Sequence, residues 1–187
     1  MKRSVLAGLV VSLAVLATAL VMSQGSSPSP SVALSPAIEQ EVSMRISSPA
    51  FEDEGDIPAQ YTCDGDDISP ALLLEDVPDD TVSLVLVMDD PDAPSGTWDH
   101  WVVYDIAPLT EIPEDVQELG TAGANSWGDK GYGGPCPPSG THRYFFRAFA
   151  LDIRLGWEEG VDKTSVLEAI HGHVLTEATL LGFYSRE

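Results

Sequence analysis

Positive charge is scarce in this sequence. Its 187 residues hold nine Lys and Arg against 30 Asp and Glu, a formal net charge of -21, and the lysines are only Lys2, Lys130 and Lys163. Such a surface repels nucleic acid and anionic lipid, which makes both poor partners. A calcium-binding surface is the sharper alternative, but the spaced acidic loop of an EF-hand is absent. We therefore interpret the acidity as a solvated surface that suits high salt.

Cysteine is also scarce. Cys63 and Cys136 are the only two, and they lie in the turn-rich stretches YTCDGDD and GGPCPPSG. In an exported protein such a pair favours a disulfide, because exposed free thiols are a liability outside the cell. Two separate thiols are the alternative. No cysteine lies near the N-terminus, which argues against a cysteine-linked lipid anchor.

One long hydrophobic run is present, at the N-terminus. Lys2 and Arg3 precede an uncharged apolar stretch that extends from Val5 to Met22. This pattern is typical of a cleaved export signal, with a small-residue cleavage site at residues 17–19, and equally of a retained membrane anchor. We interpret residues 1–22 as one or the other.

The next segment, residues 23–41, is rich in Ser and Pro and has nothing to bury, so it reads as a linker. Residues 42–187 then form the domain. It is expected to be secreted or periplasmic, or held on the outer face of the membrane by residues 5–22. Without Lys2 and Arg3, seven basic residues face 30 acidic ones, a net charge of -23.

Strand signals dominate the domain. Apolar or alternating runs separated by Pro and Gly predict strands at 41–46, 81–88, 100–106 and 142–152. This spacing favours a mainly β fold, an antiparallel β-sandwich of two packed sheets, over a βαβ protein. One helix is predicted from about Thr164 to Leu180, because Leu167, Ile170, Val174, Leu175 and Ala178 recur at helical spacing.

Acidic residues and histidines meet in two stretches of the sequence. Asp90 and Asp92 lie in a proline-stiffened turn after the 81–88 run, and His100 opens the next strand. His142 and Tyr144 follow a Gly/Pro-rich loop and share one face of a later strand. If the two loops meet, imidazoles, a phenol and free loop amides form a pocket for a small oxyanion such as phosphate. The aspartates should favour the protonated imidazoles near neutral pH.

Several motifs, in the same order, carry a family resemblance. DPDAP followed by HW, and then GPCPPSGTHRY, resemble the two signature regions of the phosphatidylethanolamine-binding protein family, also called the Raf kinase inhibitor protein family. YTCDGDDISPAL at 61–72 and AIHGHVLTEATLLGFYSR at 169–186 resemble its bacterial and archaeal branch. The resemblance covers about residues 42–187.

The resemblance implies two packed antiparallel sheets with a C-terminal helix beside a pocket for phosphate-like anions and phospholipid head groups. It also implies a non-enzymatic binding protein, with inhibition of a kinase or a protease as a biological use, and no cofactor. Matched by motif, the expected ligand site is Asp90, Asp92, Pro94, His100, Pro138, His142 and Tyr144.

A hydrolase is the alternative, because Asp90 with His100 or His142 could orient a base. Ser95 and Ser139 lie in the right loops, but no G-x-S-x-G elbow frames either one. A zinc site from the two histidines and an aspartate has suitable ligand types without recognisable spacing. His171 and His173, two residues apart on the predicted helix, make a poor metal pair. We therefore predict neither catalysis nor a metal site.

Overall fold

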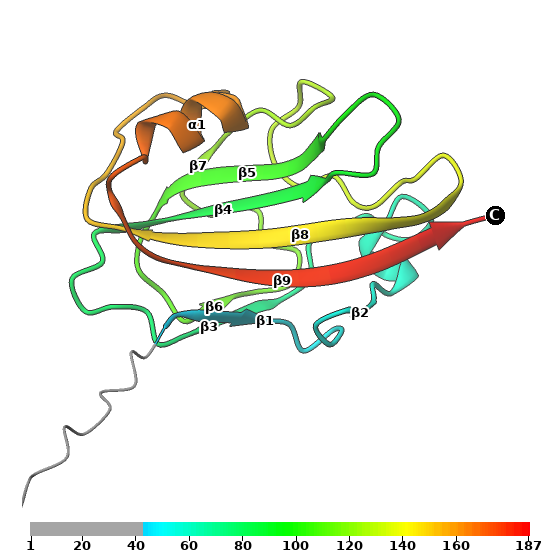
Figure 1. Cartoon of the computed structure of the whole chain (residues 1–187), viewed down its shortest axis with the longest axis horizontal. Coiled ribbons are helices and arrows are strands. Elements are labelled where there is room, and N and C mark those ends of the chain that lie inside the picture. The colour runs from blue at the N-terminus through cyan, green and yellow to red at the C-terminus, as the bar shows by residue number, and fades with distance from the viewer. Residues whose placement is uncertain (1–42) are drawn as a thin grey trace, which may run out of the picture. The chain divides into compact units, whose positions relative to one another are not determined.

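Strands are the main regular secondary structure in the part of the chain that the computed structural model describes, which is residues 43–187 (Figure 1). The segments interpreted as signal or anchor (1–22) and as linker (23–41) lie outside the described residues. Within residues 43–187, no helix has the length and apolar character needed to span a membrane.

Two sheets and one short helix organise this part of the chain. The smaller sheet has the order β1 (Arg45–Ser47), β3 (Leu72–Glu75) and β6 (Glu111–Ile112). The larger sheet has the order β2 (Gly55–Asp56), β9 (Val174–Arg186), β8 (Gly140–Leu151), β4 (Ser83–Asp90), β5 (Trp98–Ile106) and β7 (Thr121–Ala122). A single 3-10 turn, η1, covers Ala59–Tyr61. The mainly β prediction and its four strands are confirmed.

The expectation of purely antiparallel sheets is wrong at one edge. β2 pairs with β9 in parallel, with Gly55 opposite Gly182, whereas the other strand pairs are antiparallel. The chain reaches this edge after leaving β1 in the other sheet, and Ile57 N then donates to Phe183 O. The alternation of apolar residues indicates which face of a strand is buried, but not whether the neighbouring strand runs parallel or antiparallel. The parallel pairing of β2 with β9 therefore could not be predicted from the sequence.

Side chains from both sheets meet in the main core. Ile46, Leu74 and Ile112 of the smaller sheet pack in one cluster with residues of the larger sheet that include Leu86 and Phe146. In β4 the even-numbered residues face this cluster, while Val85 and Val87 face a second cluster on the other side. β4 is therefore buried on both faces, as its nearly continuous apolar run predicts.

The predicted helix at 164–180 begins where expected but is wrong in extent. α1 covers only Lys163–Ala169, capped by Asp162, whose side chain accepts from Ser165 N at 3.0 Å. Gly172 then adopts a positive φ of 85°, and the chain enters β9. Residues 174–180 also alternate with period two, because Ala178 and Leu180 are buried between exposed neighbours. The apolar spacing therefore fitted both structures.

α1 does not lie beside the predicted pocket. Its Val166 and the following Ile170 pack in the second cluster, on the face of the larger sheet opposite the main core. The last element of the chain is β9, which pairs with β8 along its length. The expectation of a C-terminal helix beside the site is therefore also wrong.

Candidate functional site

The site is built where β4 ends and β8 begins. Asp90 is the last residue of β4 and follows Leu86 and Met88 on the core side, where it is 3% exposed. His142 and Tyr144 occupy alternate positions near the start of β8, also on the core side. Strand alternation therefore brings a carboxylate, an imidazole and a phenol to the same end of the core.

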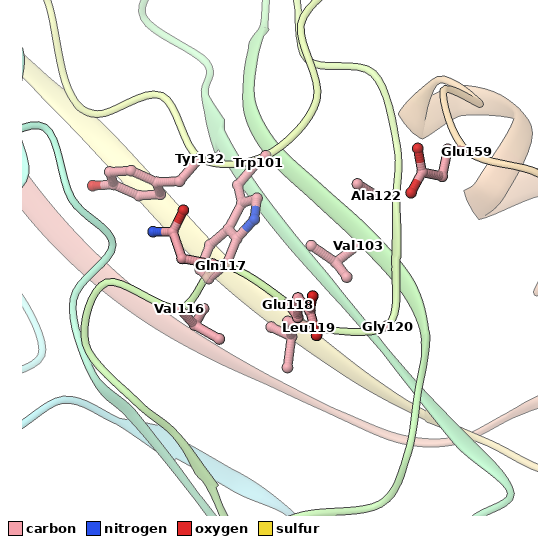
Figure 2. A pocket seen from close by; sticks show the side chains of 11 residues that line it. Trp101, Val103, Val116, Gln117, Glu118, Leu119, Gly120, Ala122, Tyr132 and Glu159 are labelled. Carbon is pink, nitrogen blue, oxygen red and sulfur yellow. The ribbon is translucent and has the colours of Figure 1, made fainter.

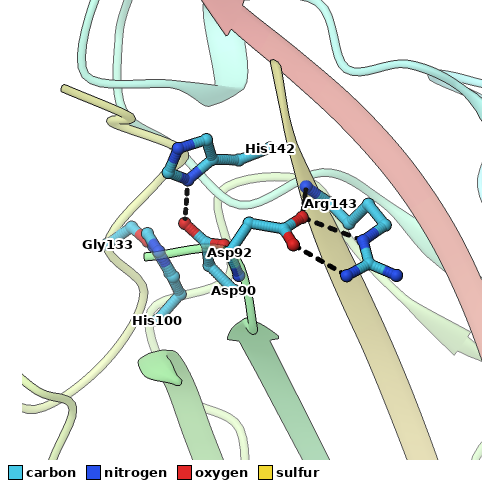
Figure 3. Close-up of polar contacts among 6 residues, drawn as sticks. All are labelled: Asp90, Asp92, His100, Gly133, His142 and Arg143. Carbon is cyan, nitrogen blue, oxygen red and sulfur yellow. Dashed lines mark hydrogen bonds and ion pairs between the residues drawn. The ribbon is translucent and has the colours of Figure 1, made fainter. Parts of the chain in front are cut away.

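Asp90 is held by two hydrogen bonds (Figure 3). Its Oδ2 accepts from His142 Nδ1 at 2.7 Å, and its Oδ1 accepts from Asp92 N at 2.8 Å, which closes the turn after β4. Because an ionised carboxylate only accepts, the proton on Nδ1 of His142 is fixed and Nε2 is left for another partner. Asp90 thus orients His142.

A β-bulge aims His100. Met88 pairs with Trp101 while Asp89 pairs with Asp99, so β5 carries one extra residue at His100. Bulges of this kind re-aim a side chain. The ring turns to the core side, where it lies 5.3 Å from the ring of Tyr144, edge to face. Its Nδ1 lies 2.7 Å from Gly133 O, a carbonyl that only accepts, so Nδ1 donates.

Burial lowers the pKa of His100 below its usual value. His100 is 3% exposed, and the loss of water outweighs the Gly133 carbonyl and the Asp90 carboxylate, which act in the opposite direction. The expectation that aspartates keep this imidazole charged near neutral pH is therefore wrong for His100. At pH 7 its ring is neutral, with the lone pair on Nε2.

Two buried donors beside His100 lack an acceptor. Among the described residues, Trp98 Nε1 and Tyr144 Oη are both buried, and neither donates a hydrogen bond. Burial, together with the Asp90 carboxylate, raises the pKa of the Tyr144 hydroxyl, so this group keeps its proton. Buried donors without acceptors are rare in folded proteins and each one calls for an explanation.

Asp92, one of the predicted ligand residues, forms an ion pair with Arg143. Arg143 clamps the carboxylate with Nε at 2.9 Å and Nη2 at 2.7 Å (Figure 3). The guanidinium lowers the pKa of Asp92 to about 2, with a smaller opposing effect from burial. The predicted ligand residue thus forms an ion pair that ties the turn after β4 to β8.

A cavity of about 240 Å³ opens next to this cluster. Of the predicted ligand residues, four line it: Asp90, Pro94, His100 and Pro138. The other three, Asp92, His142 and Tyr144, lie behind them and contact Asp90 or His100. The prediction missed five lining residues: Ala93, Ser95, Trp98, Trp127 and Cys136.

Trp127 is the most informative of the missed residues. Its ring lies 5.1 Å from His100 and 5.3 Å from Trp98, edge to face in both cases, yet the residue is 47% exposed. It comes from the loop before β8, and its place over His100 depends on tertiary folding. A single Trp in a Gly-rich loop was the only sequence signal.

One of the two cysteines, Cys136, lines the cavity. The structure joins Cys63 and Cys136 by a disulfide with Cα atoms 5.5 Å apart. Cys63 N also donates to Pro135 O, and Gly134 N donates to Asp67 Oδ1 at 2.7 Å. These links fasten the loop that carries Gly133 and Pro138 to the 61–67 segment.

A larger cavity, of about 340 Å³, lies elsewhere on the domain (Figure 2). It is lined by aromatic and aliphatic side chains that include Trp101, Tyr132 and Leu119, and its charged residues are Glu118 and Glu159. Figure 2 labels both glutamates among the side chains that line it. None of the predicted ligand residues lines this cavity.

The described residues give the site few groups that could act in catalysis or bind a metal ion. Within residues 43–187, no Ser, Thr or Cys side chain hydrogen-bonds to His100 or His142, and the structure holds Cys136 in a disulfide. The described residues also hold no group of three or more His, Cys, Asp or Glu placed to bind a metal ion. The arrangement offers hydrogen-bond donors, two imidazoles and a carboxylate around a small cavity.

Comparisons with a family model, with curated proteins and with solved structures all indicate the same family. The family model for phosphatidylethanolamine-binding protein matches residues 47–185. A UPF0098 protein from Methanothermobacter thermautotrophicus is 51% identical over 150 residues, which are 76% of this chain and 99% of that protein.

Solved structures agree. A phosphatidylethanolamine-binding protein homologue from Chlamydia trachomatis is 43% identical, with a TM-score of 0.75 over 78% of this chain and 99% of its own. Escherichia coli YbcL, described as a member of the mammalian family, is 26% identical, with a TM-score of 0.73 over 78% of this chain and 100% of its own. The chain therefore belongs to the phosphatidylethanolamine-binding protein family.

Proposed function

We propose that the domain is a non-enzymatic binding protein whose cavity at His100 holds a small oxyanion or a phosphorylated head group. The observation that carries the proposal is the pair of buried donors, Trp98 Nε1 and Tyr144 Oη, that have no acceptor beside His100. An oxyanion is an acceptor on every side, so one bound group can satisfy several donors at once. Membership of a family named for binding a phospholipid supports the same role.

The charge of the anion has to be balanced inside a cavity that is also lined by Asp90. No Lys or Arg lines it, and the neutral His100 presents a lone pair on Nε2. The anion therefore binds together with a proton, either on His100 or on the anion itself. A protonated His100 donates from Nε2 while Nδ1 keeps its bond to Gly133 O.

Binding is favoured over hydrolysis. The Asp90–His142 hydrogen bond resembles the part of a catalytic triad that orients the base, but a nucleophile bonded to the imidazole is the other half of that device. Ser95 lines the cavity without a hydrogen bond to either histidine. The site thus holds an anion without a group placed to attack it.

Regulation of a kinase or a protease is the biological use that the family resemblance offers, and we carry it as a subordinate proposal. Export of the domain by residues 1–22 would place that partner outside the cytoplasm. The net charge of -23 without Lys2 and Arg3 favours a basic protein surface over nucleic acid or anionic lipid. A pull-down with the purified domain, with and without saturating phosphate, tests whether the anion site controls such a contact.

Calorimetric titration with phosphate and with phosphoethanolamine tests the main proposal. Wild-type protein should bind, and His100→Ala and His142→Ala should weaken binding by about tenfold or more, because His100 lines the cavity and donates to the anion, and His142 holds the Asp90 carboxylate that lines it. His171→Ala, in the exposed turn after α1, is the matched histidine control and should bind as wild type. Equal binding by all four proteins would show that the cavity is not the site. Native mass spectrometry of protein from its own host would identify a retained anion.

A further inference from the structure

Two carboxylates face each other on the sheet directly behind the proposed pocket. Asp89 precedes Asp90 and Asp99 precedes His100, so strand alternation turns them to the face opposite the cavity. Asp89 and Asp99 are also direct cross-strand partners of β4 and β5. Like charges in this position destabilise strand pairing. Asp89 is 1% exposed, so water screens it poorly.

Lys163 lies between the two carboxylates. Its Nζ is 2.9 Å from Asp89 Oδ2 and also contacts Asp99 Oδ1, and its side chain is 12% exposed. Lys163 is the first residue of α1, which packs on this face through Val166. The helix thus delivers one partly buried cation to a pair of anions, of which Asp89 is buried and Asp99 partly buried.

Arg147 is a second cation that contacts Asp89, and it can be compared with Lys163. Its Nη1 lies 3.2 Å from the same Asp89 Oδ2, but its side chain is 36% exposed. Asp89 is the one carboxylate that it contacts among the described residues, whereas Lys163 joins both strands. The two cations carry the same charge and differ in whether they bridge β4 to β5.

The bridged pair adjoins the bulge that aims His100. Met88 pairs with Trp101 on one side of the bulge, and Asp89 pairs with Asp99 on the other. If the Asp89–Asp99 pair separates, the extra residue loses the strand pair next to it on its outer side. The direction of the His100 ring, and with it the Nδ1 bond to Gly133 O, then depends on the Asp90–Trp98 pair at the strand end and on the Ser126 contacts of Asp99.

We infer that Lys163 is a positioning residue for the proposed anion site, acting through the sheet from its opposite face. The inference rests on the proposed function for the identity of the ligand. Lys163 touches neither the cavity nor the anion. It holds the β4 and β5 ends together, and so fixes the direction of the His100 ring and the place of Asp90.

Three variants test this inference: Lys163→Met, Arg147→Met, and Lys163→Met combined with Asp89→Asn and Asp99→Asn. Phosphate affinity is measured by calorimetry well below the melting temperature, and the His100 ring nitrogens are followed by ¹⁵N NMR. Lys163→Met should weaken phosphate binding by about tenfold or more, because it leaves Asp99 without its cation, leaves Asp89 with only the more exposed Arg147, and so lets the two carboxylates repel each other across the strands. Its His100 signal should lose the single tautomer with the proton on Nδ1.

The other two variants distinguish a positioning role of Lys163 from a general effect of its positive charge. Arg147→Met removes the same unit charge and should weaken binding by less than about threefold, with an unchanged His100 signal. The triple variant removes the repulsion and should restore both affinity and signal. If Lys163→Met does not fold, Lys163→Gln replaces it under the same criteria.

Each result bears on the inference. Wild-type affinity and signal in Lys163→Met, or equal losses in Lys163→Met and Arg147→Met, would overturn it. Failure of the triple variant to recover would also overturn it, because repulsion between Asp89 and Asp99 would not be the cause. Absence of phosphate binding in wild-type protein would instead remove the proposed function, and the His100 signal would still decide the role of Lys163.

Discussion

Binding of a non-titrating anion should draw a proton into the protein. Burial lowers the pKa of His100, whose Nδ1 bonds to a backbone carbonyl, so the free protein carries a neutral ring at pH 7 to 8. An anion in the adjacent cavity favours the protonated ring, because it adds a negative charge beside the imidazole. Sulfate is the suitable probe, since it does not itself titrate near neutral pH.

The size of the effect follows from proton linkage. If one proton enters with each sulfate, the dissociation constant falls about tenfold for each unit of decreasing pH, or about 100-fold from about pH 8 to about pH 6. A free histidine would stop contributing near its pKa of about 6.5. Because the pKa of His100 is lowered, the dependence should continue below that value until the ring of the free protein titrates.

Calorimetry in buffers of different ionisation enthalpy counts the protons directly. We expect close to one proton per sulfate for wild type and for the control His171→Ala, and close to none for His100→Gln, which keeps a polar side chain without a titrating group. Zero uptake in wild type, with affinity flat from about pH 8 to about pH 6, would refute the reasoning. Uptake that persists in His100→Gln would place the proton on another group.

Three further predictions concern stability. Replacing Cys63 and Cys136 by Ser should lower the free energy of unfolding by about 2–4 kcal/mol, because the disulfide closes a loop with a sequence separation of 73. An unchanged denaturant midpoint in this variant, or two alkylatable thiols in oxidised wild-type protein, would contradict the prediction. Arg143→Met should lower the free energy of unfolding only slightly at pH 7, since the Asp92 pair is exposed to solvent, which screens it. That stability is present above the unfolded pKa of Asp92 and should disappear as pH falls toward about 2, with the variant and wild type converging in acid denaturation. The thermal midpoint should rise between about 0.01 and about 1 M sodium chloride because salt screens the net charge; a flat or falling midpoint would count against self-repulsion.

Much of the site was accessible from the sequence because it depends on strand periodicity. Asp90 follows an apolar run, and His142 and Tyr144 alternate at the start of another, so their shared face could be predicted. The contact between Asp90 and His142 followed once β4 and β8 became neighbours. The ligand set came from motif resemblance, and the structure distributes it between the cavity lining and a supporting layer.

The parts that could not be predicted depend on tertiary context. The pKa of His100 needed its burial, which outweighs the nearby carboxylates that are visible in the sequence. The bulge at His100 needed the register of both β4 and β5. The segment 174–180 fitted both a helix and a strand, and only the turn at Gly172 and the pairing with β8 decide between them.

The acidic surface and the cavity act on a ligand in opposite ways. A net charge of -23 repels an approaching anion, but the Debye length is only about 8 Å at physiological ionic strength, so most of that repulsion is screened. The same negative field attracts protons and so helps His100 to take up its charge when an anion arrives. If the proposed function holds, a cavity walled by Asp90 and a neutral imidazole, rather than by Lys or Arg, would select an anion that arrives with a proton. Among phosphorylated ligands this favours the monoanion over the dianion, because the monoanion brings that proton itself and leaves less charge to be balanced.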